Sequence, residues 1–296
     1  MYPDEFDYYG ADSVGEALDL LDEYSGAETE LLAGGHSLLP AMKTGLSSPD
    51  VLIDISGIDA MHGIETDGDT LSIGPMTRYS DLVESDAVAE HAPALADAVQ
   101  QVGDVQVRNR GTIGGNLAHA DPAADLPGAA LASDATLMVE GADGERSIPA
   151  DDFFFGMYTT DVGSDELLTR VEVPSADGGV GAYAKKPSPS SGYAMVGVAA
   201  LLDTDDGTVE SVRVGANGVM DHGVRLGPVE DALAGGSLDA DAIATAAGRA
   251  GDDLDEDMMM NDLQASNEFR AQLLEVYTER ALTAAMDQVG GSAAAD

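Results

Sequence analysis

Two glycine-rich stretches contain the residues of this chain that could bind a ligand through bare backbone. The first is LAGGHSL, residues 32–38, and the second is GTIGGN, residues 111–116. Glycine lets a backbone approach a ligand closely, and unpaired N–H groups at the start of a helix attract an anion. Thr112 and Asn116 add neutral donors. Together the two stretches predict a cradle that holds a diphosphate from two sides.

Other chemistries at these stretches have weaker support. Neither stretch has the Gly-Lys-Ser/Thr of a P-loop or the GxGxxG of a Rossmann turn. His36 and His119 stand alone and lack the spacing of metal ligands, so we interpret them as loop residues. Asp121 and Asp125 could act as acid and base, but aspartate occurs throughout the chain. We therefore assign no catalytic residue and no metal site.

The elements around the first stretch predict a small βαβ lobe over residues 1–56. Ser13 and Glu16 form a capping box at the start of a helix over 13–24. Strands are expected at 29–33 and 51–55, with a helix at 38–43 between them. The first stretch thus joins a strand to a helix.

The rest of the first domain predicts a mainly antiparallel lobe over residues 57–174, and this lobe carries the second stretch. A hairpin is expected over 64–74, helices near 78–84 and 93–101, and strands at 136–140, 146–148 and 167–173.

The chain then changes character. Residues 175–183 are expected to be a linker, 184–287 a domain of antiparallel strands followed by helices, and 288–296 a disordered tail. The predicted fold class is α+β.

Charge and composition limit the partners of the chain. Its 55 acidic and 13 basic residues give a formal net charge of −42. Such a charge repels itself unless concentrated salt screens it, so we expect a halophilic protein that binds neither nucleic acid nor anionic membranes. The N-terminus lacks a signal pattern and no apolar run reaches spanning length, which predicts a cytoplasmic protein. Because cysteine is absent, cysteine-ligated clusters must lie on a partner.

At this point the motifs show a family resemblance. AGGHSLLPAMK followed by RNRGTIGGNLAHADPAADLP resembles the FAD-binding medium subunit of the molybdenum hydroxylases, the xanthine dehydrogenase and aerobic carbon monoxide dehydrogenase family. The later KKPSPSSGYA and the helical C-terminus resemble the same subunit. The resemblance implies a two-part FAD-binding domain of the PCMH type, followed by a C-terminal domain with an antiparallel sheet and helices.

The resemblance also implies which residues contact FAD. The two glycine stretches would hold the diphosphate, Asp125 would accept a hydrogen bond, and Lys185 and Tyr193 would lie near the flavin. Family members often have a basic residue or histidine where Pro187 and Ser188 stand here, so this segment departs from the pattern. The implied cofactor-binding residues are Leu32, Ala33, Gly34, Gly35, His36, Ser37, Leu38, Gly103, Thr112, Ile113, Gly114, Gly115, Asn116, Asp125, Leu167, Lys185 and Tyr193.

The implied function is electron transfer within an oxidoreductase complex. In the family, a large subunit carries the molybdenum cofactor and a small subunit carries two [2Fe–2S] clusters. This chain would receive electrons on FAD and pass them to an external acceptor, in a dimer of heterotrimers. The alternatives are a self-sufficient flavin oxidoreductase of the same fold and an acidic assembly subunit without cofactor. The sequence leaves open the substrate of the complex and the identity of the acceptor.

Overall fold

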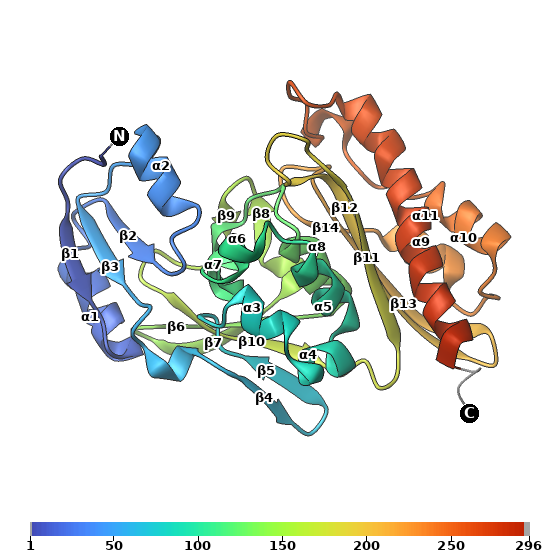
Figure 1. Cartoon of the computed structure of the whole chain (residues 1–296), viewed down its shortest axis with the longest axis horizontal. Coiled ribbons are helices and arrows are strands. Elements are labelled where there is room, and N and C mark those ends of the chain that lie inside the picture. The colour runs from blue at the N-terminus through green and yellow to red at the C-terminus, as the bar shows by residue number, and fades with distance from the viewer. Residues whose placement is uncertain (1, 293–296) are drawn as a thin grey trace.

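The computed structural model describes residues 2–292 as a row of three parts, a small lobe, a middle lobe and a C-terminal domain (Figure 1). The strands are β1 (Asp7–Gly10), β2 (Thr29–Leu32), β3 (Val51–Asp54), β4 (Ile64–Asp67), β5 (Thr70–Ile73), β6 (Thr136–Gly141), β7 (Gly144–Pro149), β8 (Phe154–Gly156), β9 (Thr159–Thr160), β10 (Leu167–Pro174), β11 (Val180–Pro187), β12 (Ala194–Asp205), β13 (Thr208–Asn217) and β14 (Val224–Arg225). The α-helices are α1 (Val14–Glu23), α2 (Leu38–Thr44), α3 (Tyr79–Val83), α4 (Asp86–His91), α5 (Pro93–Gln100), α6 (Val105–Arg108), α7 (Ile113–His119), α8 (Leu126–Ala132), α9 (Gly227–Leu233), α10 (Ala240–Ala247) and α11 (Asn267–Ser292).

The small lobe is a parallel three-stranded sheet in the order β1-β3-β2, with α1 and α2 as its helices. The predicted capping box is present in a shifted form: the Ser13 hydroxyl accepts from the Glu16 N–H, but the Glu16 carboxylate accepts from the N–H of Asp12 and not from that of Ser13. The sequence analysis missed β1, whose residues pair in parallel with Val51–Asp54 of β3. Its sequence, DYYG, is too short and polar to show a buried strand pattern.

The middle lobe contains an antiparallel sheet in the order β4-β5-β10-β6-β7, as predicted, with helices packed against it. The helices α4, α6, α7 and α8 were not predicted. Two of them, α7 and α8, contain glycine, and α7 overlaps the second glycine stretch. Glycine lowers intrinsic helix propensity, so only tertiary packing makes these segments helical.

The C-terminal domain is an antiparallel sheet in the order β11-β12-β13-β14. Helix α11 packs on β11 and β12, while α5 and α8 of the middle lobe also contact this sheet (Figure 1). The sheet is therefore sandwiched between its own helix and the middle lobe.

Two predicted boundaries are wrong. Strand β11 begins at Val180, so residues 180–183 are strand rather than linker. A Cβ on Gly181 would lie 2.9 Å from the Cα of Ala94, so this glycine permits close packing on α5 and does not mark a flexible joint. Helix α11 continues through residues 288–292, which were expected to be a disordered tail, and 293–296 lie outside the described residues.

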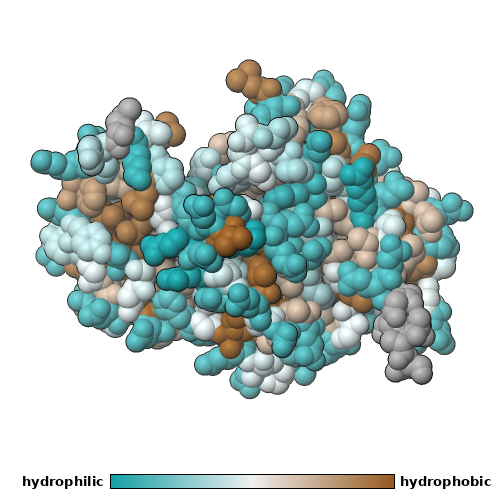
Figure 2. Space-filling model, in the orientation of Figure 1, coloured by the Kyte–Doolittle hydropathy of each residue, from teal (hydrophilic) through white to brown (hydrophobic). Residues whose placement is uncertain are grey.

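The surface agrees with the composition. The face shown in Figure 2 is largely hydrophilic or neutral, and its apolar residues form small separate patches. Among the helices of residues 2–292, none is long and apolar enough to span a membrane.

Candidate functional site

The two glycine stretches pack directly against each other, which joins the small lobe to the middle lobe. A Cβ on Gly34 would collide with the carbonyl of Arg110 and lie 2.9 Å from the Cα of Gly111. A Cβ on Gly115 would lie 3.2 Å from the Cβ of Ala33. The structure thus brings together the two stretches that the sequence separates by more than seventy residues.

The first stretch leaves a run of backbone donors free. It follows β2 and ends at the start of α2, as predicted. Within residues 2–292, the five consecutive N–H groups of residues 34–38 have no protein acceptor. Gly35 has a φ of +73°, which glycine adopts without the strain of a side chain. His36 is exposed and its neighbours in the stretch are half-buried. This run of free N–H groups is suited to an anion.

The second stretch differs, because the N–H groups of residues 113–116 are already bonded within the protein. Helix α7 begins at Ile113, and Thr112 is its N-cap. The N–H groups of Ile113 and Gly114 donate to the carbonyls of Thr77 (3.1 Å) and Pro75 (2.8 Å). Those of Gly115 and Asn116 donate to the hydroxyl (3.2 Å) and carbonyl (3.1 Å) of Thr112. The symmetric cradle expected from the sequence is therefore one-sided in its backbone donors.

The glycines of the second stretch serve packing. A Cβ on Gly114 would lie 2.8 Å from the Cα of Pro75, and one on Gly111 would collide with the ring of Tyr79. One polar group remains available, since the buried Oδ1 atom of Asn116 has no partner within residues 2–292. An orphaned buried acceptor is costly, which indicates that a donor completes the site when a ligand binds.

Asp125 and Lys185 form a buried ion pair where the C-terminal domain meets the middle lobe. The Lys185 Nζ lies 3.0 Å from Asp125 Oδ2, and both side chains are less than a tenth exposed. The hydroxyl of Tyr183 donates to Asp125 Oδ1 at 2.6 Å. Burial raises the pKa of Asp125, and the Lys185 charge and the Tyr183 hydrogen bond partly oppose that rise. Burial, followed by the Asp125 charge, raises the pKa of Tyr183 well above its usual value.

Lys185 links three segments that carry predicted site residues. Besides Asp125, its ammonium donates to the carbonyl of Gln101 at 2.7 Å and to that of Gly192 at 3.1 Å. Gln101 lies two residues before Gly103, and Gly192 directly precedes Tyr193. The lysine thus holds these segments at one point.

Tyr193 faces the first glycine stretch from the C-terminal domain. It is 42% exposed, so its ring offers an accessible flat surface. Burial and the nearby Asp121 carboxylate raise the pKa of Tyr193, while an interaction with the Ser37 hydroxyl opposes the rise. The site therefore draws residues from the small lobe, the middle lobe and the C-terminal domain.

Two other predicted residues have structural roles. Gly103 has a φ of +49°, and a Cβ there would lie 2.7 Å from the Cβ of Val107, so the turn requires glycine. Leu167 is 2% exposed and belongs to the apolar cluster of the small lobe. Its side chain is therefore committed to the core.

Tyr183 and Asn217 were not predicted from the sequence. Tyr183 lies two residues before Lys185, on the same face of β11, and this period-two spacing was the available signal. Asn217 is fully buried at the end of β13, with its Oδ1 3.4 Å from the Tyr183 hydroxyl. Only the folded sheet brings it there.

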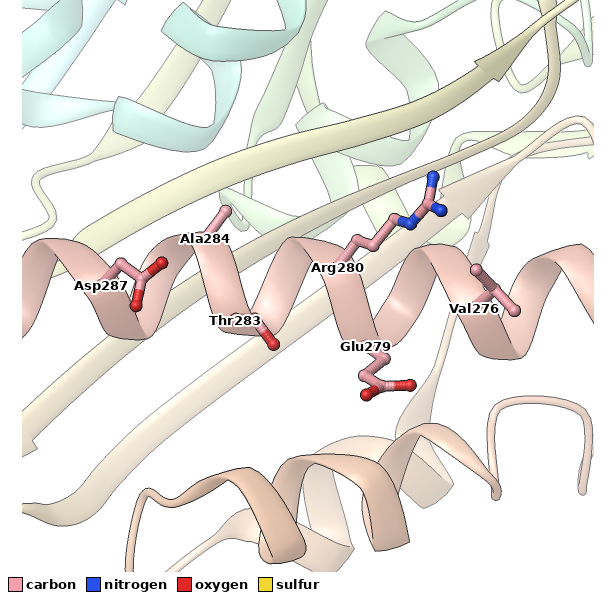
Figure 3. Close-up of a pocket in the computed structure, with 6 residues that line it drawn as sticks. All are labelled: Val276, Glu279, Arg280, Thr283, Ala284 and Asp287. Carbon is pink, nitrogen blue, oxygen red and sulfur yellow. The ribbon is translucent and has the colours of Figure 1, made fainter.

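Other features of the described residues do not extend the site. Within residues 2–292, no group of three His, Cys, Asp or Glu residues is arranged to hold a metal. A shallow groove follows α11, lined by residues that include Val276, Arg280 and Asp287 (Figure 3). Its lining comes from α11 alone and includes none of the residues predicted to bind a cofactor.

Comparison with known protein families covers both parts of the chain. Residues 4–176 match the FAD binding domain in molybdopterin dehydrogenase. Residues 181–285 match the CO dehydrogenase flavoprotein C-terminal domain.

Individual relatives match over nearly their full length. The carbon monoxide dehydrogenase medium chain of Hydrogenophaga pseudoflava is 37% identical over 286 residues, 96% of this chain and 98% of that one. The glyceraldehyde dehydrogenase medium chain of Sulfolobus acidocaldarius is 36% identical, with 95% and 98% covered. Among solved structures, carbon monoxide dehydrogenase from Hydrogenophaga pseudoflava superposes with a TM-score of 0.92 at 38% identity, covering 97% of this chain and 99% of that one.

Proposed function

The chain belongs to the FAD-binding medium subunits of the carbon monoxide dehydrogenase and xanthine dehydrogenase type of molybdenum hydroxylase, and on that premise we propose how its residues hold the cofactor. It is an electron-transferring subunit of an oxidoreductase, and its cofactor is FAD. Bound FAD supplies the redox chemistry, while the protein binds, orients and tunes it.

The free N–H groups of residues 34–38 carry the proposal. They and the start of α2 hold the diphosphate, since an anion is the ligand that a run of unpaired donors favours. The second stretch supports this run through the contact of Gly34 with Gly111, and it adds the orphaned Oδ1 acceptor of Asn116, which can accept from a hydroxyl or N–H group of the cofactor but not from the diphosphate. The residues present therefore fit the group that the family carries.

The remaining predicted residues either offer a surface to the flavin or hold the segments that surround it. The accessible ring of Tyr193 provides a surface for the flavin, and Asp125 and Lys185 hold the segments around it. Gly103 shapes the neighbouring turn, and the contact of Leu167 with cofactor runs through its backbone because its side chain is in the core.

The partners and setting follow the family division of labour. We propose that a small subunit with [2Fe–2S] clusters delivers electrons to this chain, that a large subunit carries molybdenum, and that the complex is a cytoplasmic dimer of heterotrimers. The absence of cysteine supports clusters on a partner. The net charge of −42 supports a halophilic setting, and the thermal midpoint should rise as potassium chloride increases.

The test is an FAD titration of the purified chain in concentrated potassium chloride, followed by absorption and by analysis of flavin released with acid. The unaltered chain should bind one FAD. Gly35→Ala should weaken binding, because a side chain in the left-handed region shifts the free N–H groups. A folded chain that takes up no FAD would refute the proposed function.

Gly45→Ala is the matched control. Gly45 has a φ of +75°, close to that of Gly35, and it ends α2 where Gly35 precedes that helix. Nothing lies within 4 Å of a Cβ at Gly45. Both variants carry similar backbone strain, of about 1 kcal/mol. A Cβ at Gly35 also lies 2.9 Å from Leu39 Cδ1, the end of a flexible side chain that can move aside. Only Gly35 lies among the free donors. Equal FAD affinity for the two variants would show that the first stretch does not hold the diphosphate.

A further inference from the structure

Arg270 is a buried charge far along the chain from the glycine stretches. It lies in the first turn of α11 and is 2% exposed. Its Nη2 atom lies 2.8 Å from Asp262 Oδ2, and its Nη1 atom donates to the carbonyls of Met195 and Gly218, each at 2.5 Å. Burying a guanidinium is costly unless its donors are used. Its Nε has no partner within residues 2–292, so the three bonds of Nη1 and Nη2 must hold it and thereby constrain the segments they join.

Asp262 is itself held in place to receive this guanidinium. Its Oδ1 accepts from the N–H groups of Gln264 at 2.8 Å and Ala265 at 3.0 Å. Burial opposes its ionisation, but these bonds and the Arg270 charge prevail and lower the pKa of Asp262. The carboxylate therefore fixes the arginine, and the arginine fixes the two carbonyls.

The two carbonyls belong to the segments that hold loop 121–125. Met195 follows Ala194, whose N–H donates to the carbonyl of Ala123 at 3.0 Å. The N–H of Gly218 donates to the carbonyl of Pro122 at 2.7 Å. The Arg270 guanidinium is thus hydrogen-bonded both to the start of β12 and to the residue after β13. Each of these two segments is also hydrogen-bonded to loop 121–125.

The backbones at this junction are too close for a side chain to separate them. Gly218 has a φ of +81°, and a Cβ there would lie 2.6 Å from the Met195 carbonyl oxygen and 2.8 Å from that of Ala194. Tyr193 directly precedes Ala194 at this junction, and Asp125 is the last residue of loop 121–125, which is hydrogen-bonded to the junction. A shift at the guanidinium is therefore passed to both residues.

We propose that Arg270 is a positioning residue for the FAD site, acting through the Met195 and Gly218 carbonyls on loop 121–125 and Tyr193. This inference rests on the proposed function, because it assumes that FAD binds beside that loop. Because Arg270 is 2% exposed, we expect it to act through these carbonyls rather than by contact with the cofactor. A remote domain helix thereby sets the geometry of the site.

The test compares Arg270→Lys with the unaltered chain. Lysine keeps the charge but lacks the planar fork that reaches two carbonyls and a carboxylate together. In the flavin-free protein, amide exchange at Ala194 and Gly218 should accelerate about tenfold. In the loaded protein, FAD affinity should fall about tenfold, and the visible circular dichroism and reduction potential of the flavin should shift. Asp262→Asn should produce smaller changes in the same direction.

Arg249→Lys is the control in the same domain, because among residues 2–292 the Arg249 guanidinium forms only an exposed ion pair with Asp252. It should change none of these measurements. Faster exchange in Arg270→Lys with unchanged affinity, circular dichroism and potential would overturn the inference and leave Arg270 a purely structural residue. If the unaltered chain bound no FAD, the proposed function would fail separately. Unchanged amide exchange in Arg270→Lys would in that case still show that Arg270 does not hold the segments at Met195 and Gly218.

Discussion

The two glycine stretches look alike in sequence but are built for different purposes. Residues 34–38 keep their N–H groups free, whereas residues 113–116 donate theirs to Thr77, Pro75 and Thr112. In the first stretch Gly35 provides a left-handed turn and Gly34 packs against Gly111, whereas in the second stretch the glycines serve close approach of backbones and rings alone. The difference teaches that bare backbone has two uses, and that only its hydrogen bonds tell which one applies.

The largest expected effect tests the part of the site that depends on side chains. Lys185→Met should lower the free energy of unfolding by about 3–5 kcal/mol, because it leaves the buried Asp125 carboxylate without its counter-ion. Urea unfolding measures this change. Adding Asp125→Leu should restore much of the loss. Lys43→Met, at an exposed position on α2, should stay within about 0.5 kcal/mol of the unaltered chain. A small effect of Lys185→Met would show that the pair is not buried in solution.

A smaller loss should follow substitution in the second stretch. Gly114→Ala places a Cβ against Pro75 and should cost about 1–3 kcal/mol of folding free energy, because backbone surrounds the site. Gly15→Ala in α1, where the Cβ meets open space, should instead stabilise by up to about 1 kcal/mol. Thermal unfolding separates the two. If Gly114→Ala kept full stability and lost only FAD, the second stretch would be a ligand loop after all.

The cap of α7 should contribute less. Thr112→Ala removes the hydroxyl that accepts from the Gly115 N–H and should cost about 1 kcal/mol. Thr112→Ser keeps that acceptor and should retain most of the stability. Denaturant midpoints for the two variants provide the measurement, and equal midpoints would contradict the capping role.

The smallest expected effect is on the pH dependence of stability. Neither glycine stretch contains a carboxylate, so this prediction concerns a carboxylate outside both stretches, that of Glu166. Hydrogen bonds from Arg146, followed by the Gly163 N–H, lower the pKa of Glu166 below its usual 4.5 against the opposing effect of burial. The unfolded chain therefore binds more protons, so the stabilisation is present above pH 4.5 and is lost as pH falls through the folded-state pKa. Glu166→Gln should make the unfolding midpoint less dependent on pH from pH 6 downward, by roughly the contribution of one titrating group. If the variant showed the same pH dependence of the unfolding midpoint as the unaltered chain, Glu166 would not contribute to it.

Much of the architecture was readable from local patterns. The capping box at Ser13 and Glu16, the strand-to-helix turn at Gly34 and the antiparallel sheets were predicted from spacing alone. Segments with mixed signals were not predicted. Strand β1 is short and polar, and α7 contains two consecutive glycines, so their neighbours decide their conformation.

By itself, the sequence determined the family and the location of its two glycine stretches, because short motifs specify turns, caps and close backbone approach locally. Only the tertiary structure decided which N–H groups are bonded and which stay free. The N–H groups of Ile113 and Gly114 are bonded because their acceptors, the carbonyls of Thr77 and Pro75, are brought to them from another segment. It also decided that Lys185 and Asp125, sixty residues apart, form a buried pair. Long-range contacts of this kind depend on how the sheets and helices pack, which no local pattern encodes.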